Sequence, residues 1–233
     1  MDYQNRHVVV TGGTGALGAA VVGALLAAGA VCHIPYRNKE EAQRFSHRDQ
    51  PRAALVPLDN LADEAAVARF YGGLETLWAS IHIAGGFAYA PLAQSNKAVL
   101  MSQLESNLVS ACLCSGAAVA AFKRAGSGGR IVNVVARQAL EPRLGANLTA
   151  YTAAKAGLAG FTMALAEEVA RDGILVNAIA PSIMNTPANR ASMPKADFNT
   201  WPKVEEVAKT ILYLASPHYS VTRGAIVPTY GRA

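Results

Sequence analysis

The chain has 233 residues, a length that favours one domain over two. Apolar residues make up 52% of it, which excludes a disordered protein because this much apolar surface can form a core. The net charge is +5, but no basic run exceeds three residues and none alternates with aromatic residues, so nucleic-acid binding is not expected. Charged residues are only 16% of the chain, which suggests that part of the surface is buried between subunits.

Residues 8–36 contain no Asp, Glu, Lys or Arg, and such a stretch is typical of a membrane span or a signal peptide. Six glycines interrupt it, and Ala is more frequent in it than Leu or Ile. A buried strand, a glycine turn and a buried helix explain these features better, so we expect no membrane segment. The three cysteines lack disulfide or zinc spacing, and the histidines also lack ligand spacing. We therefore predict a reduced, cytoplasmic protein without a metal site.

Short β-branched runs alternate with longer runs of helical period along the whole chain. Strands are expected at residues 8–10, 31–36, 54–58, 76–83, 130–135, 175–179 and 225–227. Helices are expected at residues 19–28, 39–45, 62–74, 97–123, 151–171 and 204–216. Repeated strand–helix units imply right-handed crossovers, so the predicted fold is α/β, with a doubly wound parallel sheet of about seven strands. Residues 181–202 hold four prolines and no sustained period, which predicts a binding loop or lid.

Glycines follow the first expected strand at positions 12, 13, 15 and 18, just before a helix. A chain that turns sharply and approaches a pyrophosphate closely needs residues without a Cβ. The helix N-terminus then offers free N–H groups to the phosphates. The segment predicts dinucleotide binding, and the alternative is a glycine turn with only a structural role.

The segment TGGTGALG resembles the TGxxxGxG fingerprint of the short-chain dehydrogenases/reductases, and the resemblance extends over nearly the whole chain. Ala84, Gly85 and Gly86 resemble the end of that family's NNAG motif, with His82 and Ile83 in place of the asparagines. The family implies a single NAD(P)-binding Rossmann domain over residues 1–233. It also implies a catalytic role for Tyr151 and Lys155 of the YxxxK motif, and for Asn107. The cofactor-binding residues that it implies are Gly12, Thr14, Gly15, Ala16, Leu17, Gly18, Arg37, Asp59, Asn60, Ala84, Gly85, Gly86, Lys155, Pro181 and Thr186.

Tyr151 and Lys155 are four residues apart on an expected helix and therefore share one face. A nearby lysine cation stabilises a phenolate and is expected to lower the pKa of Tyr151 below its usual value of about 10. Tyr151 would then give a proton to the atom that forms as hydride arrives. Asn107 would hold a water that links Lys155 to solvent, unless it is an ordinary residue of the helix surface.

The end of the second expected strand bears on the choice of cofactor. Enzymes that use NAD usually place Asp or Glu there, to bind the ribose hydroxyls. This chain has Pro35, Tyr36, Arg37 and Asn38, and the Arg37 guanidinium suits a 2′-phosphate. NADP(H) is therefore predicted over NAD(H), although the glycine loop carries no basic residue and Arg37 is alternatively a solvated charge.

The serine that family members carry after the fifth strand aligns here with Ala136. In that family the serine hydroxyl hydrogen-bonds the substrate carbonyl, and losing one such donor typically costs about 10²–10³ in rate. Candidate substitutes are Arg137, Gln138, Asn147 and Thr149. Residues 135–140 and the loop at 185–201 resemble the dihydropteridine reductases, which also have alanine in place of the serine. Pro35 and residues 227–233 differ from that group.

The leading interpretation is an oxidoreductase that transfers hydride between NADP(H) and a small carbonyl or quinonoid substrate. A dihydropteridine-reductase-like enzyme is the close alternative, and an NADP(H)-binding regulator without catalysis is the alternative of another class. Apolar residues recur at helical spacing within residues 97–123 and 151–171. Core packing explains much of this pattern, and the family's four-helix contact predicts a homodimer or homotetramer.

Overall fold

A computed structural model describes residues 2–233, and its centre is a seven-stranded parallel sheet. The strand order β3-β2-β1-β4-β5-β6-β7 confirms the doubly wound α/β fold that the sequence predicts. The strands are β1 (His7–Thr11), β2 (Val31–Tyr36), β3 (Ala53–Pro57), β4 (Ala79–His82), β5 (Gly129–Val134), β6 (Ile174–Pro181) and β7 (Ile226–Thr229).

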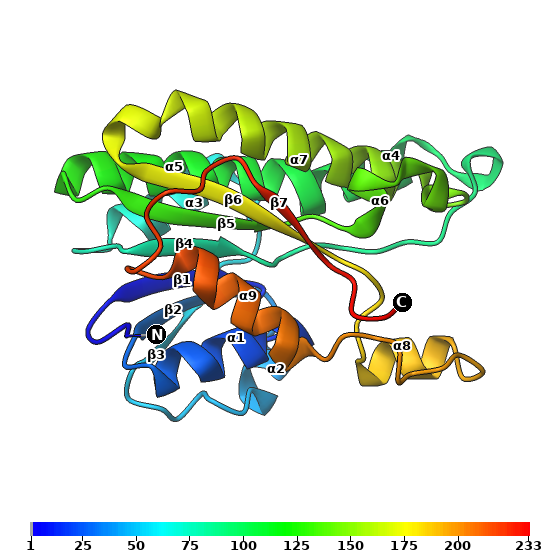
Figure 1. Ribbon diagram of the computed structural model, residues 1–233, viewed down its shortest axis with the longest axis horizontal. Helices are drawn as coiled ribbons and strands as arrows, with labels where there is room; N and C mark the ends of the chain where they lie inside the picture. Colours follow the sequence, from blue (N-terminus) through cyan, green and yellow to red (C-terminus); the bar gives the residue numbers. More distant parts are fainter. Residues whose placement is uncertain (1) are drawn as a thin grey trace.

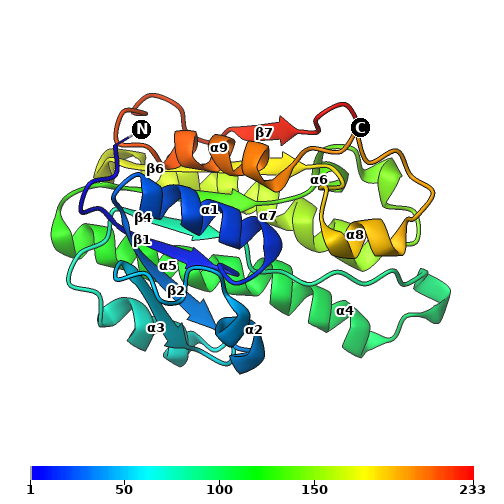
Figure 2. The same ribbon diagram turned by 90° about the horizontal axis from the view of Figure 1, so that it is seen from below.

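Helices cover both faces of the sheet, with α3, α5 and α7 on one side and α1 and α9 on the other (Figures 1 and 2). The strands are therefore continuous apolar runs, such as the fully buried Val8, Val9 and Val10 of β1. The helices are α1 (Ala16–Ala27), α2 (Lys39–Arg44), α3 (Glu64–Gly72), α4 (Lys97–Leu104), α5 (Ser110–Ala125), α6 (Arg137–Leu140), α7 (Thr149–Glu168), α8 (Pro187–Ser192) and α9 (Val204–Ala215).

The helix expected at residues 97–123 has an irregular turn in its middle. A π-helical segment, Glu105–Val109, separates α4 from α5. The whole stretch Lys97–Ala125 is long and apolar enough to cross a membrane by length and composition, and in the fold it packs against α3 and α7. The core helix of a globular protein meets the same criteria of length and composition. The π-helical turn was not predicted because one wider turn hardly changes the apolar periodicity of the sequence.

The loop predicted at residues 181–202 contains the short helix α8. Pro187 occupies its first turn, and the Thr186 hydroxyl accepts a hydrogen bond from the Asn189 N–H at 3.2 Å. The four prolines of residues 181–202 leave no sustained period, which is why the sequence predicts no element there. In Figure 2, α8 lies toward the same end of the molecule as α4 and the C-terminus.

Strands β1 and β4 are neighbours in the sheet although two strand–helix units separate them in sequence. The strand order runs in opposite directions on either side of this pair. In doubly wound sheets, the carboxyl ends of the strands at this reversal border a crevice that binds ligands. The turn after β1 and the turn after β4 meet there.

Candidate active site

The turn after β1 is packed too closely for side chains at two of its glycines. Gly12 has φ of +69°, and a Cβ on it would lie 2.7 Å from the Ala84 backbone nitrogen. A Cβ on Gly18 would lie 2.1 Å from the Gly12 carbonyl oxygen. Ala16 stands at the second glycine of the TGxxxGxG pattern and begins α1. No side chain caps the first turn of α1, so its N–H groups remain available to an anion.

A cavity of about 730 Å³ runs from this turn to the turn after β4. It brings together most of the residues that the sequence predicts around a cofactor. These are Gly12, Thr14, Gly15, Ala16, Leu17, Gly18, Arg37, Asp59, Asn60, Ala84, Gly85 and Gly86. Lys155, Pro181 and Thr186 are not in its lining. Other lining residues were not predicted from the sequence, because they lie on helices and belong to no recognisable motif; among them are Glu41, Gln103 and Ser106.

Lys155 and Tyr151 come from the first two turns of α7. Lys155 is 4% exposed, and its Nζ donates a hydrogen bond to the Val134 carbonyl of β5 at 2.7 Å. The same Nζ lies 5.9 Å from the centre of the Tyr151 ring. Burial lowers the pKa of Lys155 to about 8 and raises the pKa of Tyr151 to about 12. The expected lowering of the Tyr151 pKa is therefore wrong for this structure, because desolvation of the phenolate dominates.

A phenol with this raised pKa stays protonated at neutral pH, which suits a proton donor. The Phe87 and Tyr151 rings pack edge to face, with 5.3 Å between ring centres. Phe87 follows the Ala84 turn, and its loop is tied to the turn before α7 by a 3.0 Å bond from the Ala90 N–H to the Asn147 carbonyl. Phe87 was not predicted from the sequence, because its contact with Tyr151 depends on tertiary packing.

Asn107 lies in the π-helical turn and is almost fully buried, so it is not a residue of the helix surface. Its Nδ2 donates to the Gly86 carbonyl at 2.9 Å, while its buried Oδ1 has no protein partner. A Cβ on Gly85 would lie 2.6 Å from this Oδ1 and 3.5 Å from the Lys155 Nζ. The backbone of Gly85 therefore passes between the two side chains, where only glycine fits.

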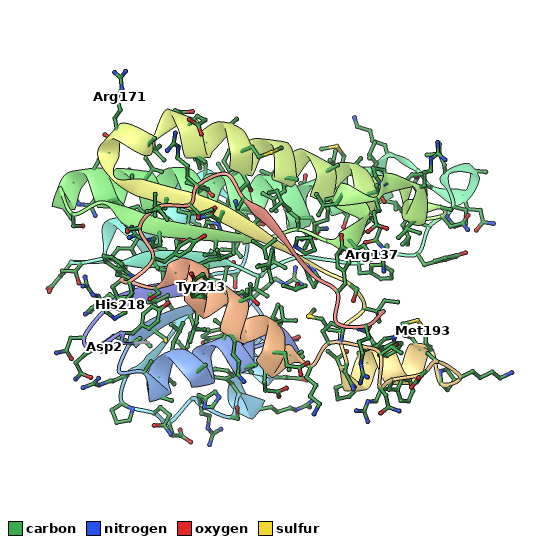
Figure 3. All side chains as sticks on the ribbon, in the orientation of Figure 1. Asp2, Arg137, Arg171, Met193, Tyr213 and His218 are labelled. Atoms are coloured by element: carbon green, nitrogen blue, oxygen red, sulfur yellow. The ribbon has the colours of Figure 1, made fainter. Side chains whose placement is uncertain are left out.

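Ala136, which the sequence aligns with the family's serine, lies two residues after the end of β5 and carries no hydroxyl. The Arg137 guanidinium, one candidate substitute, binds both Glu141 carboxylate oxygens at 3.1 and 3.2 Å. It also donates to the Ala233 carbonyl at 3.0 Å and stacks 4.6 Å from the centre of the Tyr230 ring. Figure 3 shows Arg137 beside the end of the chain. These contacts hold the guanidinium against the C-terminal residues.

The profile of the family described as short chain dehydrogenase matches residues 6–197 of the chain. The chain belongs to the short-chain dehydrogenase/reductase family. It is 33% identical to cis-4-hydroxycyclohexanecarboxylate dehydrogenase of Sinomonas cyclohexanicum over 98% of the chain and 96% of that protein. It is 29% identical to the 3-oxoacyl-[acyl-carrier-protein] reductase of Pseudomonas aeruginosa over 99% of the chain and 98% of that protein. These relatives make the chain an NAD(P)-dependent oxidoreductase.

Solved structures of short-chain dehydrogenases/reductases have the same fold. An oxidoreductase of this family from Burkholderia thailandensis superposes with a TM-score of 0.86 at 27% identity, over 98% of this chain and 92% of that one. ElxO with NADP bound superposes with a TM-score of 0.87 at 21% identity, over 98% of both chains. The second match shows the fold alone.

This short-chain dehydrogenase has a buried polar chain beneath α7. The Tyr71 and Ser80 hydroxyls lie 2.7 Å apart, Ser80 Oγ lies 2.8 Å from His82 Nε2, and His82 Nδ1 lies 2.8 Å from Asn133 Oδ1. Asn133 Nδ2 donates to the Thr162 hydroxyl of α7 at 2.9 Å. Because the Asn133 oxygen only accepts, it selects the neutral tautomer of His82 with the proton on Nδ1.

Burial lowers the pKa of His82 from 6.5 to about 4, so His82 is neutral in the folded enzyme at pH 7. Unfolded chains bind this proton near pH 6.5, so the contribution of His82 to stability is complete above that pH. It is lost as the pH falls toward 4, by about 3 kcal/mol. We expect the wild-type free energy of unfolding to fall more steeply between pH 7 and pH 4 than that of His82→Asn. Urea unfolding at both pH values measures this, and equal slopes would contradict the assignment.

The remaining histidines and the cysteines bear on whether the protein holds a metal ion. His7 Nδ1 lies 3.0 Å from His33 Nε2 across β1 and β2, and burial lowers the pKa of His33 to about 4. All three cysteines are free thiols. Within residues 2–233, no group of three or more His, Cys, Asp or Glu side chains is arranged to hold a metal ion.

Proposed function

We propose that this enzyme transfers hydride between NADP(H) and a small carbonyl or quinonoid substrate, with Tyr151 as the proton donor. The observation that carries the proposal is that Gly85, in the wall of the glycine-lined cavity, lies between the Asn107 and Lys155 side chains. A dinucleotide in this cavity would have its phosphates at the first turn of α1 and its far end beside Lys155 and Tyr151.

The residues present fit a nicotinamide dinucleotide. The first turn of α1 is uncapped, Gly12 and Gly18 exclude side chains, and Asp59 and Asn60 lie in the cavity wall. A bound nicotinamide ring supplies or accepts the hydride. Lys155, Pro181 and Thr186 would hold the nicotinamide half, and residues 181–202 would form the substrate loop over it.

In reduction, hydride adds to the carbon of the substrate carbonyl, and the Tyr151 hydroxyl gives its proton to the oxygen. The Lys155 cation stabilises the phenolate that remains, and its pKa of about 8 allows it to return a proton to Tyr151. The unpartnered Asn107 Oδ1 would accept a hydrogen bond from a water that connects Lys155 to solvent. Tyr151 and Lys155 therefore act as proton donors, and Asn107 acts as a hydrogen-bond acceptor.

Two features favour a flat, electron-poor ring substrate. Phe87, which packs on Tyr151, and nearby Tyr89 are both 66% exposed, and such apolar surface suits a ring. Ala136 provides no donor to a substrate oxygen, so an acceptor that is already activated is favoured. One relative is named for a cyclohexane ring, which agrees with a cyclic substrate. A quinonoid dihydropterin remains the alternative to a cyclic carbonyl compound.

The experiment is oxidation of NADPH and NADH, side by side, with a quinonoid dihydropterin and with a panel of cyclic diketones. Turnover with the dihydropterin at higher kcat/KM would identify a dihydropteridine-reductase-like enzyme. Turnover with the diketones alone would identify a carbonyl reductase. Tight NADPH binding without turnover on either class would contradict the proposal and favour a regulator.

Arg37 carries the proposed preference for NADP(H). It is exposed in the cavity wall, and no ion pair within residues 2–233 includes it. We expect Arg37→Gln to weaken NADPH binding about 10- to 100-fold and to leave NADH binding unchanged, because only NADPH has the 2′-phosphate. Calorimetric titration measures both. Arg44→Gln, on α2 but outside the cavity lining, is the control, and an equal loss for both nucleotides would refute the preference.

We also propose a cytoplasmic homodimer or homotetramer, with no nucleic-acid or membrane partner. The outer faces of α5 and α7 support a subunit contact because they expose small residues. A Cβ on Gly116 of α5 or on Gly160 of α7 would meet nothing within 4 Å, and Met163, three residues after Gly160 on α7, is 49% exposed. Helices with such small residues can pack closely against a second copy.

A further inference from the structure

The charged side chains that line the cofactor cavity are mostly acidic, which is not what a simple phosphate-binding site requires. The charged side chains in its lining are Arg37, Glu41, Asp59 and Glu105, so one base stands among three acids. A site that binds a 2′-phosphate strongly normally places bases around it. One of these carboxylates, that of Glu41, reaches across to the turn between β1 and α1, which we call the phosphate loop.

Glu41 lies in the first turn of α2 and accepts a hydrogen bond at Oε2 from the Thr14 hydroxyl at 3.3 Å. Thr14 belongs to the turn between β1 and α1, so this contact spans the mouth of the cavity between the phosphate loop and the end of β2. The Asn38 side chain holds the first turn of α2 in place by accepting from the Glu40 and Glu41 N–H groups at 2.8 and 3.2 Å.

The adjacent Glu40 differs from Glu41 in having a basic partner and in lying outside the cavity wall. Its carboxylate lies 3.6 Å from Arg44 on the exposed side of α2, and Glu40 is not in the cavity lining. None of the ion pairs within residues 2–233 includes Glu41. Glu41 is therefore a carboxylate without a basic partner, and it lines the same cavity as Arg37. The two glutamates form a matched pair for mutation.

We propose that Glu41 is a cofactor-discriminating residue that opposes Arg37. Resting on the proposed binding of the dinucleotide in this cavity, the inference assigns to Glu41 the part that an acidic residue at the strand end plays in enzymes that use NAD. Its carboxylate accepts a hydrogen bond from the adenosine ribose hydroxyl of NAD(H). The same carboxylate repels the 2′-phosphate of NADP(H).

Two consequences follow from this pair of opposed charges. The enzyme accepts both nucleotides, because Arg37 favours the phosphate and Glu41 favours the hydroxyl. The preference for NADPH over NADH also depends on the balance between the two residues. Removing the Arg37 charge shifts the preference toward NADH, and removing the Glu41 charge shifts it toward NADPH.

The test measures dissociation constants of NADPH and NADH for wild type, Glu41→Gln and Glu40→Gln. For Glu41→Gln we expect NADPH to bind roughly tenfold more tightly, because one like charge near a dianion is removed. NADH is expected to bind about threefold more weakly, because a neutral amide oxygen replaces a charged acceptor. Glu40→Gln should change neither constant by more than about twofold, as is usual for an exposed surface pair.

A second measurement uses 2′,5′-ADP and 5′-AMP as probes of the adenosine half alone. Glu41→Gln should tighten binding of 2′,5′-ADP but not that of 5′-AMP. Equal changes for both probes, or a response of Glu40→Gln as large as that of Glu41→Gln, would overturn the inference. If wild type binds neither NADPH nor NADH, the proposed function fails instead. If Arg37→Gln is silent while Glu41→Gln behaves as expected, the opposition to Arg37 is overturned and the discriminating role of Glu41 is supported.

Discussion

Replacing Tyr151 with Phe is expected to lower kcat by about 10³-fold or more, because a general acid contributes about 10²–10⁴ and phenylalanine has no proton to donate. The phenylalanine ring keeps the edge contact with Phe87, so the fold and NADPH binding should be preserved. Steady-state turnover with the best acceptor from the panel measures kcat, and calorimetry measures NADPH binding.

Tyr213→Phe is the matched control, since Tyr213 is 55% exposed on α9, away from the site (Figure 3). A Tyr151→Phe variant that retains more than about a tenth of wild-type kcat would show that the proton comes from elsewhere.

The wild-type rate of reduction should also decline above about pH 8, because the buried Lys155 loses its proton there. Without the Lys155 cation, the phenolate left by Tyr151 is no longer stabilised.

Replacing Gly18 with Ala is expected to weaken NADPH binding about 100-fold and to destabilise the fold by about 1–3 kcal/mol. The added Cβ would meet the Gly12 carbonyl oxygen at 2.1 Å and the Gly13 Cα at 2.6 Å. Both contacts are with backbone, so the phosphate loop itself must move away from α1. Titration with NADPH and thermal unfolding measure the two effects.

Gly72→Ala, at the end of α3, is the control for Gly18→Ala. A Cβ there would meet nothing within 4 Å, so neither stability nor binding should fall. If Gly18→Ala bound NADPH as tightly as wild type, the phosphate-loop assignment would be wrong. If Gly18→Ala were unstable to isolation, the same titration of Gly15→Ala would test the loop, because its Cβ lies at an ordinary 3.4 Å from Gly12.

Long elements and their order were predictable because they leave periodic signals in the sequence. Strand β1 and helix α7 are apolar runs of the expected type, and the glycines at positions 12 and 18 identify the turn between β1 and α1. Their arrangement into a parallel sheet follows from crossover handedness. Helix α8 escaped prediction because it lies among the prolines of residues 181–202, where the sequence shows no sustained period.

Contacts that depend on packing were not predictable. The π-helical turn turns Asn107 inward, and its extra residue leaves no trace in the apolar pattern. Glu41 and Thr14 are 27 residues apart and meet only after α2 folds against the phosphate loop. The pKa of Tyr151 depends on burial, which spacing along α7 does not reveal. His82 was noted only as a departure from a motif, and its bond to Asn133 joins two strands.

The most direct test of the central claim follows the hydride itself. The enzyme would be incubated with NADPH deuterated at both C4 positions of the nicotinamide and with a cyclic diketone that supports turnover. Mass spectrometry of the alcohol product is predicted to show one deuterium in every molecule. A product without deuterium, formed while NADPH is consumed, would contradict hydride transfer to the substrate carbon.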